Sequence, residues 1–294
     1  MTHSKLLLAA ALATAITAAS GQEADTLAKA SASGTIVMGV RESSVPLSYA
    51  LGPDKFVGYH VEICERVLAV LLPQAKIKYQ AVTSANRIPL LQNGTIDLEC
   101  GSTTNNAARK KEVAFVNTTY VTEARLAVKT NSGITSVEQL NGKSVSTTTG
   151  TTLVQRLRRL EKTGVSMNVV MAKDHADAFL LLESGRVDAF AMDDNTLAGL
   201  IATSKKPDDF RIVGKPLGIE PIAIMIRKDD PRFKTAFDEA LRKLIASGEV
   251  ERIYAKWLLQ PIPPGNTTIA MPQNSSLKTA LSRPNDDPAE AYNQ

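Results

Sequence analysis

Short apolar runs alternate with helical segments along most of the chain. Runs over residues 35–40, 77–82, 96–100, 143–148, 167–172 and 187–192 predict buried strands. Helices are expected between them, over 58–72, 87–92, 152–161 and 175–184. In the first of these, apolar residues recur three and four positions apart, which is the spacing of a helix that covers a sheet. Strands and helices that alternate in this way are typical of mostly parallel sheets, so we predict an α/β fold.

The alternation falls into two blocks, near 34–124 and 129–212. The segments 122–128 and 213–226 run between the blocks and are expected to connect them. A length of 294 residues fits about two domains. The predicted organisation has one lobe from 22–124 and 220–260, a second lobe from 125–219, and a polar tail over 261–294 with one short helix at most.

The first 21 residues have the pattern of a secretory signal peptide. Lys5 precedes an uncharged stretch of Leu, Ala, Ile and Thr, and small residues follow it up to Ser20 and Gly21. The stretch is shorter than the roughly 20 apolar residues of a membrane span. We therefore predict cleavage after Ser20 or Gly21 and export to the periplasm, with no lipid anchor because no Cys lies at the cleavage site.

Two cysteines, Cys64 and Cys100, remain in the exported chain. One lies in a predicted helix and the other ends a predicted strand, and these two elements are expected to pack together. An oxidising compartment would allow them to form a disulfide. Two buried free thiols are the alternative, and the sequence leaves both open.

Composition excludes several function classes. Lys and Arg number 34 against 30 Asp and Glu, and the net charge of +4 offers little support for nucleic-acid binding. The motifs CxxC, HExxH and GxSxG and a Gly-rich phosphate loop are all missing. Only three His are present, which excludes a His-rich zinc site. We expect no metal, no cofactor and no nucleic-acid partner.

Polar and charged residues follow the predicted strands at their carboxyl ends, where open α/β sheets bind ligands. Taken singly, each could be a helix cap, a turn former or a surface charge. Six strand ends from both lobes share this feature, which favours a common cleft. The candidates are Arg41, Ser84, Arg87, Ser102, Thr104, Arg109, Thr151, Thr152, His175 and Asp193.

The chemistry of these candidates points to an acidic amino acid. Three arginines offer planar donors that match carboxylates, and together they predict a cleft with net positive charge. Gly150 and the two threonines after it open a predicted helix, whose N–H groups and dipole suit an anion. Asp193 suits an ammonium group.

Eight segments resemble the periplasmic glutamate/aspartate-binding proteins of amino-acid ABC importers, which belong to solute-binding protein family 3. They are RESSVPL (41–47), TSANRIPLLQNG (83–94), DLECGSTTNN (97–106), AKDH (172–175), ESGR (183–186), MDD (192–194), RKDDP (227–231) and PIPP (261–264). The resemblance implies a type II periplasmic-binding fold, in which two α/β lobes joined by a two-strand hinge close around one amino acid.

The resemblance also implies a role for each candidate. Arg41, Ser84, Arg87 and His175 would hold the ligand's side-chain carboxylate. Ser102, Thr104, Arg109, Thr151 and Thr152 would hold its α-carboxylate, and Asp193 its α-ammonium. The ligand would be L-glutamate or L-aspartate, and the partner an inner-membrane ABC permease that is contacted transiently by a monomer.

Two other function classes fit the same fold. A dehydratase-type enzyme would need a general acid or base in the cleft, and His175, Asp193 and Glu42 are available. His175 between arginines should resist protonation, which suits a hydrogen-bonding role better than proton transfer. A soluble amino-acid sensor would bind the same ligand. We expect a binding protein and no enzyme.

Overall fold

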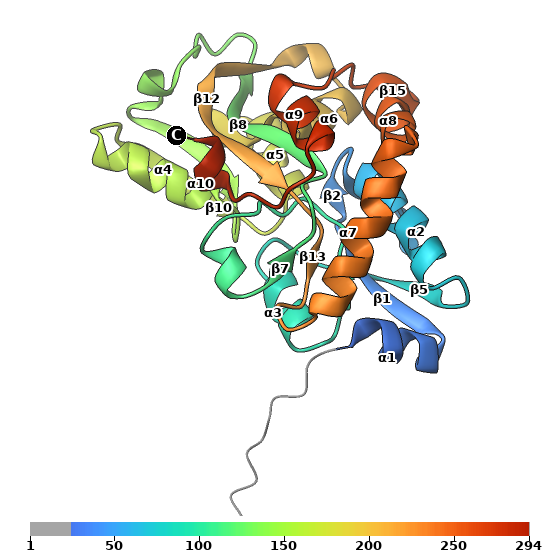
Figure 1. The fold of residues 1–294 in the computed structure, drawn as a ribbon. Coiled ribbons are helices and arrows are strands. Elements are labelled where there is room, and N and C mark those ends of the chain that lie inside the picture. The colour runs from blue at the N-terminus through green and yellow to red at the C-terminus, as the bar shows by residue number, and fades with distance from the viewer. Residues whose placement is uncertain (1–24, 294) are drawn as a thin grey trace, which may run out of the picture.

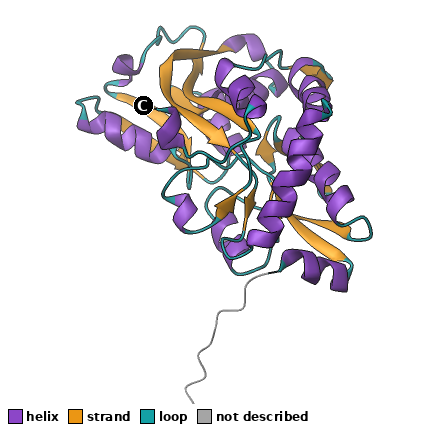
Figure 2. Cartoon of the chain, viewed as in Figure 1, coloured by secondary structure: helices purple, strands orange, loops and turns teal. Residues whose placement is uncertain are grey.

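The computed structural model describes residues 25–293, which form two α/β lobes side by side (Figures 1 and 2). Each lobe is built on a five-stranded sheet with its own buried apolar core. The predicted signal peptide, residues 1–21, lies outside the described residues. Among residues 25–293, no helix has the length and apolar character needed to cross a membrane.

Lobe 1 contains the sheet with strand order β5-β1-β6-β13-β7. β1 pairs in parallel with β5 and β6, whereas β13 is antiparallel to β6 and β7. The strands are β1 (Thr35–Val40), β5 (Lys76–Ala81), β6 (Leu98–Glu99), β7 (Ala114–Phe115) and β13 (Met225–Ile226). A smaller sheet consists of β2 (Ser43–Ser44), β3 (Ser48–Gly52) and β4 (Lys55–Val57). The helices are α1 (Thr26–Ser33), α2 (Tyr59–Leu71), α3 (Arg87–Gln92), α7 (Pro231–Ala246) and α8 (Glu249–Tyr254).

Lobe 2 contains the sheet with strand order β10-β9-β11-β8-β12. Its strands are β8 (Tyr120–Lys129), β9 (Lys143–Thr148), β10 (Met167–Ala172), β11 (Ala189–Asp193) and β12 (Phe210–Ile222). Its helices are α4 (Leu153–Lys162), α5 (His175–Glu183) and α6 (Asp194–Thr203). The predicted alternation of strands and helices in both lobes is confirmed, and β1, β9, β10 and α3 have the predicted bounds.

Two strands, β8 and β12, connect the lobes. They pair antiparallel from Tyr120↔Ile222 at lobe 1 to Lys129↔Phe210 in lobe 2. The segments 122–128 and 213–226, expected only as connections, are therefore largely sheet strands, because each continues from the lobe 1 core into the lobe 2 sheet. Since both strands belong to two cores at once, the predicted lobe boundaries stay a prediction.

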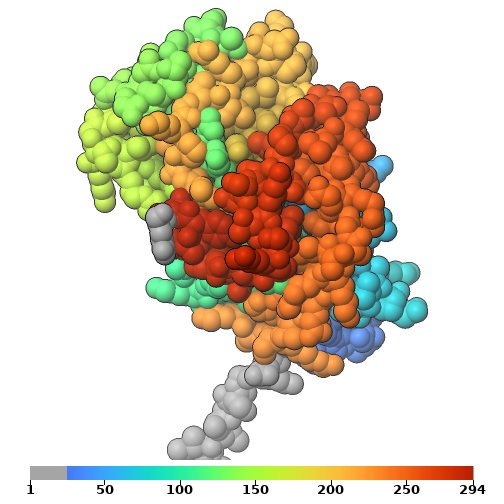
Figure 3. All heavy atoms as spheres, turned by 45° about the horizontal axis from the view of Figure 1, so that its top comes forward, coloured from blue at the N-terminus to red at the C-terminus, as the bar shows by residue number. Residues whose placement is uncertain are grey.

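The C-terminal tail contains more regular secondary structure than predicted. It contains two helices, α9 (Ser275–Ser282) and α10 (Ala289–Tyr292), and two short strands, β14 (Pro261–Ile262) and β15 (Thr267–Thr268), so the expectation of at most one helix was wrong. Figure 3 shows this segment in red on the surface between the two lobes. A few buried apolar residues, such as Leu277, suffice because they pack on a core that already exists. The tail also reaches the hinge, where the Asn293 side chain bonds the backbone N–H and C=O of Ile219.

A disulfide joins Cys64 of α2 to Cys100, which directly follows β6. Both residues are fully buried. Beside them, Nδ1 of His60 on α2 donates to the Gly101 carbonyl at 2.5 Å. Helix α2 is thus fixed at two neighbouring points to the loop that follows β6 and carries Ser102 and Thr104.

Candidate ligand-binding site

A small cavity lies between the two lobes. The empty space between its lining atoms, including any that opens to solvent, amounts to about 180 Å³. It is lined by Ser84, Arg87, Ser102, Thr104, Arg109, Thr151, Thr152, His175, Met192 and Asp193. All of these except Met192 are among the residues predicted from the strand ends. Most of its lining side chains are polar or charged, which suits a small polar ligand.

Strand direction explains why residues so distant in sequence meet. The lobe 1 residues follow β5 and β6, and the lobe 2 residues follow β9 and β10 or end β11. The carboxyl ends of these parallel strands face one another across the gap between lobes, as in open α/β sheets. Met192 was not predicted as a lining residue, because an apolar side chain within a predicted buried strand does not indicate that it faces a cavity.

Arg41 is the one predicted contact that does not line the cavity. It is fully buried behind two lining residues, with Nη1 3.3 Å from Ser102 Oγ and Nη2 3.4 Å from His175 Nε2. Its Nε donates to the Val82 carbonyl at 2.9 Å. In this conformation Arg41 therefore acts on the cavity through the residues it holds.

Several buried polar atoms at the cavity have no hydrogen-bond partner among residues 25–293. They are Nε and Nη1 of Arg87, Oγ of Ser84 and Oδ1 of Asp193. Buried polar groups are nearly always paired in folded proteins, because an unpaired one carries its full desolvation penalty. These atoms therefore mark where a polar ligand would complete the structure: an anion at Arg87 and a hydrogen-bond donor or cation at Asp193.

The pKa values of the two charged groups agree with this assignment. Burial, followed by the nearby positive charge of Arg109, lowers the pKa of Arg87 to about 9. Burial also raises the pKa of Asp193 well above its usual range, and the negative charges of Glu220 and Asp194 add to the effect. A bound carboxylate would stabilise charged Arg87, and a bound ammonium would stabilise ionised Asp193.

His175 is held neutral. Burial, with the positive charge of Arg41, lowers its pKa to about 3. A guanidinium can only donate, so His175 Nε2 accepts from Arg41 and Nδ1 carries the hydrogen, which points to Thr148 Oγ1 at 2.8 Å. Both ring nitrogens are therefore engaged with the protein.

The threonine hydroxyls at the cavity are also used within the protein. Thr104 and Thr152 donate to the carboxylate of Glu220, at 2.5 Å and 2.7 Å respectively. Thr151 donates to the Thr148 carbonyl at 2.7 Å. Any contact these residues make with an anion would have to come from their backbone N–H groups.

Arg109 is held by backbone carbonyls from both lobes. Its Nη1 donates to Thr104 O at 2.9 Å, and its Nη2 donates to Gly150 O at 3.0 Å. Each Nη carries a second hydrogen, so the guanidinium can still offer two donors to a carboxylate.

Two buried acidic residues lie near the site but were not predicted from the sequence. Glu99 is fully buried, with Oε1 3.8 Å from Nη1 of Arg87, and Glu220 is fully buried beside Thr104 and Thr152. Their negative charges offset part of the arginine charge, so the net positive charge expected for the cleft was overestimated. Glu99 lies in the segment DLECGSTTNN but within the predicted strand rather than after it, and Glu220 is a lone Glu in a mostly apolar stretch.

The lobes touch each other around the cavity. Asp174 of lobe 2 accepts from Ser43 of lobe 1, and its Oδ2 lies 3.5 Å from Nη2 of Arg41. Two glycines permit close approach: a Cβ on Gly150 would lie 2.6 Å from Ser84 O, and one on Gly199 would lie 2.6 Å from Val45 O. This arrangement is a closed conformation.

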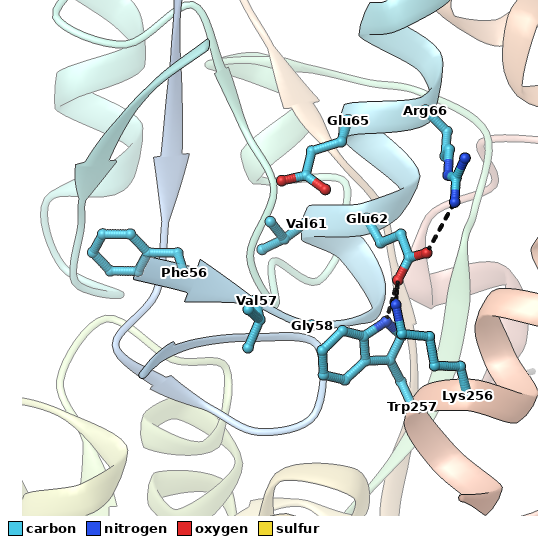
Figure 4. A pocket seen from close by; sticks show the side chains of 9 residues that line it. All are labelled: Phe56, Val57, Gly58, Val61, Glu62, Glu65, Arg66, Lys256 and Trp257. Carbon is cyan, nitrogen blue, oxygen red and sulfur yellow. Dashed lines mark hydrogen bonds and ion pairs between the residues drawn. The ribbon is translucent and has the colours of Figure 1, made fainter. Parts of the chain in front are cut away.

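A larger hollow lies on the outside of lobe 1, beside α2 (Figure 4). Glu62 there accepts from Lys256 Nζ and from Trp257 Nε1, both at 2.7 Å, and Arg66 reaches the same carboxylate. Arg66 and Lys256 pair with Glu62, and Glu65 accepts from the Tyr79 hydroxyl at 2.6 Å, so the charged groups of this hollow already have partners. The cavity between the lobes is therefore the better candidate for ligand binding.

Comparison with known proteins gives a family and several relatives. The model of the bacterial extracellular solute-binding proteins, family 3, matches residues 36–260. The glutamate/aspartate import solute-binding protein of Escherichia coli K12 is 44% identical, over 96% of this chain and 95% of its own length. The L-glutamate/L-aspartate-binding protein of Pseudomonas aeruginosa PAO1 is 43% identical, over 90% of both chains.

A solved structure agrees with this result. An ancestral arginine-binding protein bound to arginine has a TM-score of 0.70 and 28% identity, and the match covers 76% of this chain and 98% of that one. The two-lobed α/β fold predicted from the sequence is confirmed. The chain belongs to the bacterial extracellular solute-binding proteins of family 3.

Proposed function

We propose that this protein captures L-glutamate and L-aspartate between its two lobes in the periplasm and delivers them to an ABC permease. The names of the relatives from Escherichia coli and Pseudomonas aeruginosa support the ligand and the import role. The single observation that carries the proposal is the set of unpaired buried atoms on Arg87, Ser84 and Asp193, which matches the charges of an acidic amino acid.

Each part of the ligand has a place in this proposal. The side-chain carboxylate binds Arg87 and Ser84, with Arg41 and His175 behind them. The ammonium group binds Asp193. The α-carboxylate binds the free hydrogens of Arg109 and the backbone of the segment around Thr151 and Thr152, at the start of α4, where the helix dipole favours an anion.

Binding and closure are coupled in this account. A ligand held by Arg87 and Ser84 of lobe 1 gains its contacts with lobe 2, including Asp193, only when the lobes close. The closed state therefore binds the ligand more tightly than the open state and becomes the populated one. Delivery to a permease then requires recognition of the closed form.

An enzymatic role finds no support. The close relatives are named as solute-binding proteins rather than enzymes. His175, the best candidate acid or base, has a pKa of about 3 and engages both ring nitrogens with Arg41 and Thr148, so it is neutral near neutral pH and has no free nitrogen for proton transfer to a ligand. A sensor role would use the same cavity and the same ligand.

Calorimetric titration of ligand-stripped protein with L-glutamate, L-aspartate and L-glutamine tests the proposal. We expect dissociation constants near or below micromolar for the two acids, on the order of −8 kcal/mol. L-Glutamine should bind roughly 10⁴-fold more weakly, because its amide cannot supply the anionic acceptor for the unpaired donors of Arg87. Equal affinity for glutamate and glutamine would overturn the assignment.

A further inference from the structure

We propose that Glu220 is a latch between the lobes: it stabilises the closed form with contacts made entirely within the protein, and thereby slows ligand release. The inference deepens the proposed binding function and rests on it for its kinetic part. Glu220 does not line the cavity, so it is a positioning residue rather than a ligand contact.

The contacts of Glu220 join three parts of the molecule. The residue is fully buried on the hinge strand β12, opposite Thr122 of β8. Its Oε2 accepts from Thr104 of lobe 1 at 2.5 Å. Its Oε1 accepts from Thr152 Oγ1 at 2.7 Å and from Arg156 Nε at 2.8 Å, both at the start of α4 in lobe 2. One carboxylate therefore connects lobe 1, lobe 2 and the hinge.

Arg156 gives the latch a fixed geometry on the lobe 2 side. Its Nη1 donates to the Leu217 carbonyl at 2.8 Å, so the guanidinium spans from Glu220 to the backbone three residues earlier on the hinge. A side chain at Gly218 would collide with this guanidinium. The glycine thus leaves the space that Arg156 occupies.

These bonds depend on closure. If the lobes separate, Thr104 and Thr152 move apart, and one carboxylate cannot remain bonded to both. Each hydrogen bond to a charged group shifts an equilibrium, here that between the open and closed forms, by about a factor of ten or more toward the bonded state. The closed form therefore carries a stabilisation that belongs to the protein alone and is present whether or not the ligand is bound.

A consequence follows for the rates of binding. A latch that acts after the ligand has entered lowers the dissociation rate of the closed complex. It does not speed the encounter, which occurs in the open form. Loss of the latch should therefore raise the rate of L-glutamate release about tenfold or more and leave the association rate unchanged or slightly faster.

The test compares three variants of the full protein. Glu220→Gln removes the charge that Thr104, Thr152 and Arg156 share. Arg156→Gln removes only the lobe 2 cation and is the second variant should Glu220→Gln fold poorly. Glu123→Gln is the matched control, because Glu123 lies on the neighbouring hinge strand and its side chain pairs with Arg125 of the same strand, at 3.0 Å.

Two measurements are made on each variant. Stopped-flow fluorescence gives the association and dissociation rates of L-glutamate. Electron–electron spin distances between labels at Val70→Cys and Leu180→Cys, exposed positions on the two lobes, give the closed population before and after L-glutamate is added. Thermal unfolding checks that each variant is folded.

The proposal expects faster release and a smaller closed population without ligand in Glu220→Gln and Arg156→Gln, and wild-type values in Glu123→Gln. A release rate within about twofold of wild type in Glu220→Gln, or an unchanged closed population without ligand, would overturn it. The distance measurement without ligand needs no glutamate binding. A wild type that closes by itself but does not bind L-glutamate would therefore refute the proposed function and leave the latch standing.

Discussion

Arg87 and Arg109 are two buried arginines that line the same cavity, yet they differ in their partners. Arg109 donates from both terminal nitrogens to backbone carbonyls, one in each lobe. Arg87 leaves Nε and Nη1 without a hydrogen-bond partner, and its nearest acid, Glu99, lies 3.8 Å away. Both guanidiniums have hydrogens left for a ligand, but among residues 25–293 only that of Arg109 is also hydrogen-bonded to the protein.

The contrast separates two tasks within one cavity. In the proposed function, unpaired groups such as Arg87 and Asp193 would carry the selectivity for a charged ligand, because only a ligand of matching charge relieves their desolvation. Paired groups such as Arg109 and Glu220 join the lobes and set the energy of closure. Substitutions of unpaired groups should therefore change mainly ligand affinity, whereas substitutions of paired groups should also change stability or lobe closure.

The largest effect is expected from Arg87→Gln. Removal of a buried charge from its ligand partner costs about 2–5 kcal/mol, so L-glutamate affinity should fall at least about thirtyfold in calorimetry. Without ligand, the variant should unfold close to the wild-type temperature, because the removal of two unpaired donors is offset by the loss of the cation beside the buried carboxylate of Glu99. Arg66→Gln is the control, since that side chain is 54% exposed. An Arg87→Gln variant with wild-type affinity would remove Arg87 from the site.

The pH dependence of stability tests the pairing of His175. Its pKa is about 3 in the folded protein and ordinarily about 6.5, so below pH 6.5 the unfolded chain binds a proton that the folded protein does not. Stability should therefore fall as the pH decreases from 6.5 toward 3, by on the order of 2–3 kcal/mol at pH 4.5 from this group.

Urea unfolding at pH 7 and pH 4.5 measures this loss. His175→Gln should lose less stability than the wild type over the same interval. His60, whose pKa burial lowers to about 4, contributes a loss of the same sign in both proteins and therefore cancels in the comparison. Equal losses in variant and wild type would show that His175 titrates normally.

Arg109→Gln should combine a binding defect with a folding defect. The substitution leaves the carbonyls of Thr104 and Gly150 without their donor, at a cost of about 1–3 kcal/mol. For a protein of this size, that corresponds to a decrease in melting temperature of roughly 2–4 °C per kcal/mol. Calorimetry and thermal unfolding together distinguish it from Arg87→Gln. An unchanged melting temperature would contradict the paired role.

The smallest effect is expected from Thr151→Val. The Thr151 hydroxyl donates to Thr148 O, so its loss should cost about 1 kcal/mol of stability and change L-glutamate affinity by less than about threefold. A loss of affinity above tenfold would return this hydroxyl to the ligand contacts that the family resemblance implies.

Sequence patterns predicted most of the fold because they are local. The apolar runs and helical spacings located β1, β9, β10 and α3 to the residue. Nine of the ten residues that line the cavity follow from one rule, that ligands bind at the carboxyl ends of strands.

What the sequence could not predict depends on contacts between distant residues. Glu220 meets Thr104 from 116 positions away, and nothing near either residue signals the pairing. Arg41 likewise lies behind the cavity because of contacts with distant residues, namely Ser102, Asp174 and His175. The tail helices α9 and α10 were missed because they rely on an existing core rather than on an apolar pattern of their own.

The crystal structure of the complex with L-glutamate tests the central claim most directly, namely that the unpaired atoms of the cavity are the ligand contacts. The account predicts one ligand carboxylate within hydrogen-bond distance of Arg87 Nε or Nη1 and the ammonium against Oδ1 of Asp193, with Glu220 still bonded to Thr104 and Thr152. A bound glutamate that leaves Arg87 and Asp193 without partners would contradict it.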